Sequence, residues 1–248
     1  MELYLAELVG TMLLVILGDG VVANVCLART KGHDSGWIVI TTGWGLAVAL
    51  SVYCVGRISG AHINPAVTLS LASIGAFDLA LVPGYVTAQL IGAFLGAIVV
   101  WLSYLPHFDA TEDADTLRAV FCTAPAIRSV GANFVAEAVG TAVLIFGVLA
   151  IGANAGEMKG GDLDLSVVFS TGLNPALLGL LVWGIGLSLG GATGYAINPA
   201  RDLGPRLAHA VLPLEHKGHS DWGYAWVPIV GPIVGGIAGA WLFQLLGW

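Results

Sequence analysis

Charged residues are scarce in this chain. Asp, Glu, Lys and Arg together account for 10% of the 248 residues, whereas 57% are hydrophobic and the mean hydropathy is +0.87. About a quarter of the residues of a typical soluble domain are charged. The composition therefore excludes a soluble globular domain and predicts an integral membrane protein.

Cysteine is also rare. Cys26, Cys54 and Cys122 are odd in number and lack the spacing of metal or redox motifs, so no disulfide is inferred. Three histidines near the C-terminal end also lack metal-binding spacing and are predicted to lie in a solvated loop: His209, His216 and His219. Because no catalytic nucleophile, metal cluster or cofactor loop is visible, we expect neither an enzyme nor a cofactor. No nucleic-acid partner is expected either.

Long stretches without any charged residue indicate where the chain crosses a lipid bilayer. A helix needs about 20 mainly apolar residues to span the hydrocarbon core. The sequence predicts such helices at about residues 3–23, 37–56, 81–104, 133–153, 174–189 and 225–246. The acidic residues gather instead in two connecting segments, 109–115 and 157–164, which are predicted to be solvated.

The chain consists of two related halves. The motif Ala-Glu-x-x-Gly-Thr begins at Ala6 and again at Ala136, an offset of 130 residues. We therefore predict one transmembrane domain, 1–248, built from repeats at about 1–105 and 131–248 with a linker at about 106–130. Each repeat has three full spans, and an odd number of crossings inserts the second repeat upside down.

A second repeated motif predicts two short helices inside the membrane. The tripeptide Asn-Pro-Ala occurs at Asn64, Pro65 and Ala66, and again at Asn198, Pro199 and Ala200. Asn is a favoured helix cap, and Pro suits the first helical turn because its missing N–H would have no partner there. The apolar run after the first motif is about 15 Å long as helix, against a hydrocarbon core of about 30 Å. Each motif therefore starts a half-helix.

The position of these motifs suggests a polar passage. Two helix amino termini that meet at the midplane place partial positive charge there, and the amides of Asn64 and Asn198 donate hydrogen bonds to a passing oxygen. A water held by both amides cannot easily donate onward, which interrupts proton transfer along a water chain. Irregular backbone at this depth must line a wet cavity, so we predict pore-lining carbonyls at Gly60, Ala61, His62, Ile63, Gly194, Tyr195 and Ala196.

The paired Asn-Pro-Ala motifs, the two Ala-Glu-x-x-Gly-Thr motifs and their spacing make the chain resemble the major intrinsic protein family, the aquaporins and glycerol facilitators. The resemblance covers essentially the whole chain. It implies an all-α membrane protein with six transmembrane helices and two re-entrant half-helices, usually a homotetramer with one pore in each subunit. Asp202, directly after Arg201, and Pro228-Ile229 resemble the glycerol-conducting branch.

The resemblance also implies a selectivity filter at Trp44, Gly186, Tyr195 and Arg201. Water-selective members typically have His at the Gly186 position and a small residue at the Tyr195 position. Here Gly186 is expected to leave room, and the two aromatic rings offer faces for a carbon chain, whereas Arg201 donates to hydroxyls and repels cations. Glycerol facilitators commonly have Phe where Tyr195 stands, so this residue affects the ranking of solutes.

Four acidic residues lie within the predicted helices and half-helices. Glu7 and Glu137 resemble the family's buried glutamates, which accept hydrogen bonds from the re-entrant backbone, and Asp202 is interpreted as a further structural support. Asp19 is unusual in an apolar helix, and we predict that it lies at the pore mouth or at the membrane interface. The resemblance implies a cytoplasmic amino terminus, although most loop Lys and Arg would then lie outside, against the positive-inside rule.

We therefore predict a multi-pass protein of the cell membrane that conducts glycerol, other small uncharged solutes and water but excludes ions and protons. Within the channel class, the alternative is a pore whose main cargo is water, lactic acid, dihydroxyacetone, urea or hydrogen peroxide. Coupled secondary transporters also contain inverted repeats and broken helices, but the motifs place Asn rather than a carboxylate at the midplane. A non-conducting structural protein would leave the polar backbone and Arg201 in the bilayer without a purpose.

Overall fold

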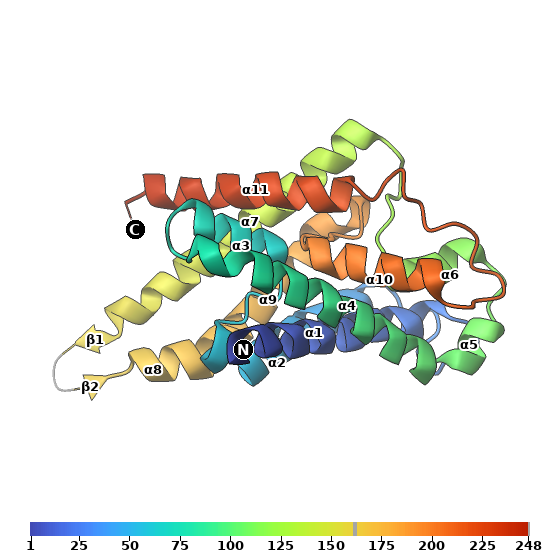
Figure 1. The fold of residues 1–248 in the computed structure, drawn as a ribbon, viewed down its shortest axis with the longest axis horizontal. Helices are drawn as coiled ribbons and strands as arrows, with labels where there is room; N and C mark the ends of the chain where they lie inside the picture. The colour runs from blue at the N-terminus through green and yellow to red at the C-terminus, as the bar shows by residue number, and fades with distance from the viewer. Residues whose placement is uncertain (161–162, 248) are drawn as a thin grey trace.

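The computed structural model describes residues 1–160 and 163–247 (Figure 1). Within these residues, six helices are long and apolar enough to cross a membrane. The predicted all-α membrane fold with six spans is therefore confirmed. The predicted solvated segment 157–164 contains residues 161–162, which lie outside the described residues, as does Trp248 at the end of the predicted domain.

The long helices begin and end close to the predicted positions. They are α1 (Glu2–Cys26), α2 (Trp37–Ser59), α4 (Val82–Ser103), α7 (Val130–Glu157), α9 (Asn174–Leu189) and α11 (Val227–Leu245). The largest difference is α7, which runs from 130 to 157 rather than from 133 to 153. The hydropathy pattern marks only the part of a helix that lies in lipid, and a helix continues into water where its residues permit.

The two half-helices are α3 (Pro65–Ser73) and α10 (Pro199–Val211), each capped by the Asn of its motif. Shorter elements connect the long helices: η1 (Leu79–Leu81), α5 (Leu105–Asp109), α6 (Ala114–Phe121), the strands β1 (Lys159–Gly160) and β2 (Leu163–Asp164), α8 (Ser166–Val168), the π-helix η2 (Phe169–Leu173) and η3 (Gly190–Ala192). The antiparallel pair of β1 and β2 is a small addition to the predicted helices.

The linker between the halves is folded over one end of the bundle. Its helices α5 and α6 lie at the end opposite β1 and β2 (Figure 1). Asp113 caps α6 by accepting a 2.8 Å hydrogen bond from the backbone N–H of Thr116. The apolar side of α6 is buried at Leu117, Val120 and Phe121. The acidic residues of this segment remain exposed, as predicted: Asp109, Glu112, Asp113 and Asp115.

One histidine does not lie in a solvated loop. His209 is on α10 and fully buried; its Nδ1 lies 2.9 Å from Ser220 Oγ, and its ring contacts that of Phe121. The prediction was wrong for His209 because α10 continues to Val211, which keeps the residue on the helix face that points into the bundle. His216 and His219 are exposed, as predicted.

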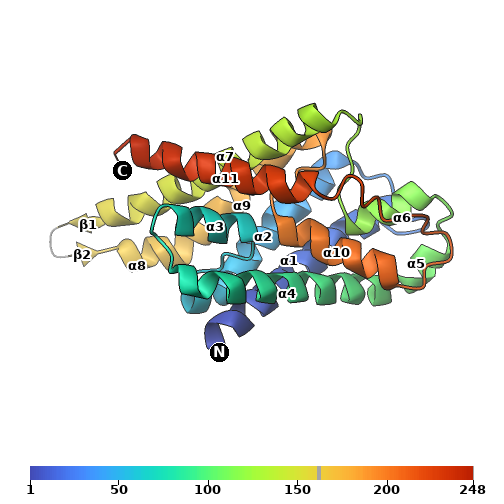
Figure 2. The same cartoon turned by 45° about the horizontal axis from the view of Figure 1, so that its top comes forward.

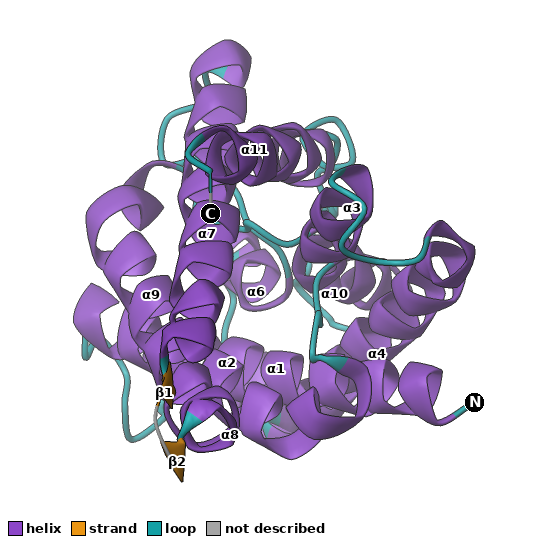
Figure 3. Cartoon of the chain, turned by 90° about the vertical axis from the view of Figure 1, so that its left-hand side faces the viewer, coloured by secondary structure: helices purple, strands orange, loops and turns teal. Residues whose placement is uncertain are grey.

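Each half-helix packs against the third long helix of the other half. Helix α3 contacts α11, and α10 contacts α4, while α1 pairs with α4 and α7 with α11. In Figures 1 and 2 the two half-helices extend in opposite directions from the middle of the molecule. Viewed along the bundle, the long helices form a ring (Figure 3). The two predicted repeats therefore contact each other through their half-helices.

Glycines bring the paired helices into direct backbone contact. A Cβ at Gly92 would overlap the carbonyl of Leu8 between α4 and α1, and one at Gly235 would overlap the carbonyl of Ala138 between α11 and α7. Small residues permit such close approach, and van der Waals contact then replaces the hydrophobic driving force that lipid does not provide. The glycine spacing in the sequence thus reflects helix packing.

Replacing Gly235 by alanine should destabilise the protein. Because the added methyl would overlap the backbone of α7, and overpacking costs about 1–3 kcal/mol or more, the melting temperature in detergent should fall by about 5 °C or more. Gly152→Ala is the matched control, since a Cβ at that position in α7 meets nothing within 4 Å. It should leave stability unchanged or raise it by up to about 1 kcal/mol. Equal melting temperatures for the two variants would contradict this account of the packing.

Candidate functional site

The two Asn-Pro-Ala motifs meet at the centre of the molecule. Asn64 Nδ2 donates to the carbonyl of Ile197 and Asn198 Nδ2 donates to the carbonyl of Ile63, both at 2.8 Å. Each side-chain oxygen accepts from its own half-helix, Asn64 from Ala66 N at 2.8 Å and Asn198 from Ala200 N at 3.0 Å. Since an amide nitrogen carries two hydrogens, each Asn retains a second N–H. The caps therefore fix both amides with a donor left for a solute.

The backbone before each half-helix has an unusual and repeated conformation. Positive φ angles occur at Gly60 (83°), Ala61 (47°) and Ile63 (43°), and at the matching positions Gly194 (79°), Tyr195 (38°) and Ile197 (42°). Left-handed backbone is costly at residues other than glycine and tends to cluster at functional sites. Residues 62 and 196 are not among them, so the chain alternates in conformation in both halves.

Two buried carboxylates hold these segments. Glu7 accepts from the backbone N–H groups of His62 (2.9 Å) and Ile63 (2.7 Å). Glu137 accepts in the same way from Ala196 (3.0 Å) and Ile197 (2.9 Å). Both glutamates are at most 1% exposed. Each glutamate thereby binds two N–H groups of its irregular segment, so that the carbonyls of the segment point away from the glutamate.

A cavity of about 430 Å³ runs past these motifs. It is lined by Tyr53 and Arg57 at one end and by Trp44 and Arg201 at the other. Residues 44 and 57 are 13 positions apart on α2, so the cavity is about 20 Å long. The predicted pore residues that line it are Asn64, Asn198, Gly60, Ala61, His62, Ile63, Tyr195 and Ala196.

The cavity lining differs from the prediction at several positions. Among the described residues, the lining lacks Gly186 of the predicted filter and, from the two motifs, Pro65, Ala66, Pro199 and Ala200. Gly194 is not among the described residues that line it, whereas Ile197 is. The carbonyls of Ile63 and Ile197 accept from Asn198 and Asn64, so both are already engaged across the junction. Each of these two carbonyls keeps one lone pair for a further hydrogen bond, and the carbonyls nearer the amino-terminal end of each irregular segment are not engaged across the junction.

Arg201 lies at one end of the cavity against an aromatic ring. Its guanidinium carbon is 4.1 Å from the ring centroid of Trp44, in cation–π contact. The Arg201 side chain is 7% exposed, and its Nη1 lies 3.5 Å from the carboxylate of Asp19. The prediction that Asp19 lies at the pore mouth or the interface was wrong, because Asp19 is completely buried behind this pair.

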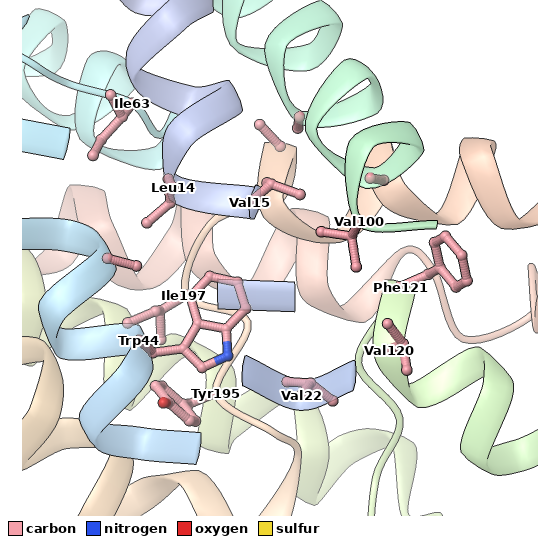
Figure 4. Close-up of a cluster of buried hydrophobic side chains, with 14 of the residues drawn as sticks. Leu14, Val15, Val22, Trp44, Ile63, Val100, Val120, Phe121, Tyr195 and Ile197 are labelled. Atoms are coloured by element: carbon pink, nitrogen blue, oxygen red, sulfur yellow. The ribbon is translucent and has the colours of Figure 1, made fainter. Parts of the chain in front are cut away.

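Tyr195 occupies the space beside Gly186. A Cβ at Gly186 would lie 2.7 Å from Cζ and 2.8 Å from Oη of Tyr195. The ring also packs edge-to-face on Trp37, with centroids 5.8 Å apart, and Trp37 Nε1 donates to the carbonyl of Gly186 at 3.1 Å. The room expected for a solute at Gly186 is thus filled by the tyrosine. Figure 4 shows Trp44 on α2 and Tyr195 on the segment before α10.

The family model for major intrinsic proteins matches residues 1–243. The chain belongs to the major intrinsic protein family. It is 64% identical over 246 residues to a probable glycerol uptake facilitator protein of Thermotoga maritima, covering 99% of this chain and all of that protein. It is 52% identical over 239 residues to the glycerol uptake facilitator protein of Bacillus subtilis, covering 96% and 82%.

A solved structure of the same family has the same fold. The aquaglyceroporin from Plasmodium falciparum superposes with a TM-score of 0.83 at 31% identity, covering 98% of this chain and 95% of that one. Together with the six apolar helices, this makes the protein an integral membrane protein of a channel family.

In this major intrinsic protein, Asp202 and Arg206 form a fully buried ion pair on α10. Nε of Arg206 donates to Asp202 Oδ1 at 2.8 Å, and Nη2 donates to Oδ2 at 2.9 Å. Asp202 also accepts from the backbone and hydroxyl of Thr123 in the linker. Arg206 donates further to the carbonyls of Ser220 and Thr123. The pair fastens the linker and the segment before α11 to the half-helix that carries Arg201.

Several functional partners were not found from the sequence. Ser59 and Thr193 donate to Glu7 and Glu137, respectively, at 2.6 Å. They precede Gly60 and Gly194 at the same offset of 134, a signal that could have identified them. Gln89 on α4 donates to Glu7 at 2.7 Å and carried no such signal. The side chain of His62, whose carbonyl was the predicted group, lies with its Nδ1 3.0 Å from Oγ1 of Thr68.

Proposed function

We propose that this chain is a passive channel for glycerol and other small uncharged solutes, with water, and that it excludes ions and protons. The observation that carries the proposal is the end of the cavity, where the guanidinium of Arg201 lies on the ring of Trp44 beside Tyr195. At this point the guanidinium of Arg201 can donate hydrogen bonds to hydroxyl groups, and the aromatic rings of Trp44 and Tyr195 can contact a carbon chain. A polyol is the small neutral solute that uses both. The relatives named as glycerol uptake facilitators support this cargo.

The chemistry of passage follows from the donors along the cavity. Arg201 holds fixed forked donors for solute hydroxyls and repels cations. Asn64 and Asn198 each offer one N–H at the point where two half-helix amino termini meet. A water that accepts from both cannot relay a proton, because its oxygen is committed and its hydrogens point away. Conduction is then diffusive, without a coupled ion or a chemical step.

We further propose that the protein resides in the cell membrane as a homotetramer with one pore in each subunit. The domain comprises the whole chain, with inverted repeats at about 1–105 and 131–248. The filter consists of Trp44, Gly186, Tyr195 and Arg201, with Gly186 acting through Tyr195. Large apolar side chains exposed along the long helices fit a lipid environment: Leu46, Ile58, Leu102, Leu180 and Trp241.

Stopped-flow light scattering on proteoliposomes tests the proposal by comparing water, glycerol and a larger polyol with and without the protein. We expect glycerol entry that is fast, does not saturate and depends weakly on temperature. Passage through a preformed pore requires no large conformational change, so the activation energy stays low. Fast water with glycerol entry no faster than in empty vesicles would show that Tyr195 closes the filter to polyols and would refute glycerol as the cargo.

A further inference from the structure

Asp19 is a buried carboxylate that the proposed permeation path does not use. It lies on α1, is 0% exposed, and is not among the residues that line the cavity. Neither of its oxygens accepts a hydrogen bond from any described residue. Its carboxylate faces Nη1 of Arg201 at 3.5 Å, and that nitrogen likewise makes no hydrogen bond among the described residues. An isolated buried charge is strongly unfavourable, so the contact with Arg201 explains why a carboxylate can be buried at this position.

Helix α1 is shaped to bring Asp19 to this position. The preceding residue, Gly18, lies so close to Trp44 that a Cβ there would overlap the indole ring. The ring of Trp44 in turn lies against the guanidinium of Arg201. Gly18 therefore lies against the ring of Trp44, and Asp19 lies next to the charged group of Arg201.

Asp202, the other acidic residue near Arg201, already accepts hydrogen bonds from other residues. Asp202 follows Arg201 in sequence, but both of its oxygens accept from Arg206, and it also accepts from Thr123. The two acids and two arginines thus form two separate pairs, Asp202 with Arg206 and Asp19 with Arg201. Among the described residues, Asp19 is therefore the acid that forms an ion pair with Arg201.

We propose that Asp19 is the counter-ion of the filter: it positions the guanidinium of Arg201 and offsets its charge, so that the pore offers oriented donors without attracting anions. This inference rests on the proposed function as a channel for neutral solutes. Arg201 and the two half-helix amino termini all present positive potential to the cavity. That potential excludes cations but favours anions. A buried acid behind the filter corrects this bias without narrowing the passage.

The charge can be removed with little change in shape by Asp19→Asn. We expect chloride conductance in planar bilayers to rise by about tenfold or more over the wild-type protein, since a cleft of one sign concentrates counter-ions by such factors. Glu2→Gln is the matched control, because it removes one negative charge from the same helix at an exposed position. It should leave the conductance at the wild-type level. Chloride conductance in Asp19→Asn equal to that of Glu2→Gln would overturn the charge-offsetting role.

A melting-temperature cycle tests the pairing independently of transport. Arg201→Val leaves Asp19 buried without its cation and should lower the melting temperature by about 5 °C or more. Adding Asp19→Asn to Arg201→Val should recover much of that loss, whereas unpaired residues would give additive shifts. Additive shifts would overturn the proposal. If Asp19→Asn alone does not fold but the double variant does, the pairing is supported.

The two failures can be told apart. Wild-type vesicles that do not admit glycerol refute the proposed cargo, while the melting-temperature cycle still reports whether Asp19 and Arg201 are coupled. Wild-type vesicles that admit glycerol, together with an unchanged chloride conductance in Asp19→Asn, leave the channel function intact and refute the role of Asp19.

Discussion

Gly186→Ala is expected to lower glycerol permeability by about tenfold or more while water permeability falls much less. The added methyl would lie 2.7 Å from Cζ and 2.8 Å from Oη of Tyr195, closer than real Cβ contacts. There is little space for the ring to move along the wall, because Gly190 lies so close that a Cβ there would be 2.5 Å from Cδ1 of Tyr195, and because Trp37 packs on the ring. It must therefore move toward the cavity. A displaced ring that raises the barrier to glycerol by about 1–3 kcal/mol would lower its rate of passage roughly five- to 150-fold.

Stopped-flow measurements on three variants isolate this effect. Gly184→Ala is the control on the same helix, because a Cβ there meets nothing within 4 Å; its permeabilities should match the wild type. Adding Tyr195→Cys to Gly186→Ala removes the displaced ring and should restore glycerol entry above that of Gly186→Ala alone. If Gly186→Ala conducts glycerol like Gly184→Ala, the added methyl does not move Tyr195 into the cavity. The assignment of Gly186 to the filter then fails.

The second large effect is expected from Glu137→Gln. Its carboxylate accepts from Thr193 Oγ1 (2.6 Å) and from the N–H groups of Ala196 and Ile197. An amide has only one acceptor oxygen, so at least one of these donors would face an NH₂ group. An unsatisfied buried donor costs about 1–3 kcal/mol, and the segment that carries Tyr195 can escape this cost by changing conformation. Glycerol and water permeability should both fall by about tenfold or more.

This loss should occur without unfolding. Circular dichroism is expected to give the wild-type helical content, since the groups that bond the Glu137 carboxylate lie between η3 and α10, outside the long helices. Glu157→Gln, at the exposed end of the same helix, is the control and should conduct normally. Wild-type permeability in Glu137→Gln would mean that the segment is held by its own backbone and by Asn198 alone.

The features that could be predicted from the sequence are those with a local cause. The starts of α3 and α10 followed from Asn as cap and Pro as first helical residue, both of which act within one turn. The six spans followed from hydropathy over about 20 residues. The four filter residues came from resemblance, whereas the pore roles of Asn64, Asn198 and the backbone carbonyls were inferred from the motifs. All of these roles stay predictions that transport measurements must test.

The features that the sequence did not reveal depend on contacts between distant segments. Nothing near Asp19 in sequence indicates that Arg201, 182 positions later, would face it. Likewise Gly186 suggests open space until the path of the Tyr195 ring is known. His209 was misplaced because a histidine-rich stretch resembles a solvated loop when the end of α10 is unknown. In each case the environment of the residue is set by a neighbour that is distant in sequence and that tertiary packing places beside it.

The exchange of half-helices between the two halves also governs how the protein is made. Helix α3 packs against α11, which is synthesised much later, and its nine residues are too few to span the bilayer alone. During synthesis the first re-entrant segment must therefore wait for most of the chain before its final neighbour arrives.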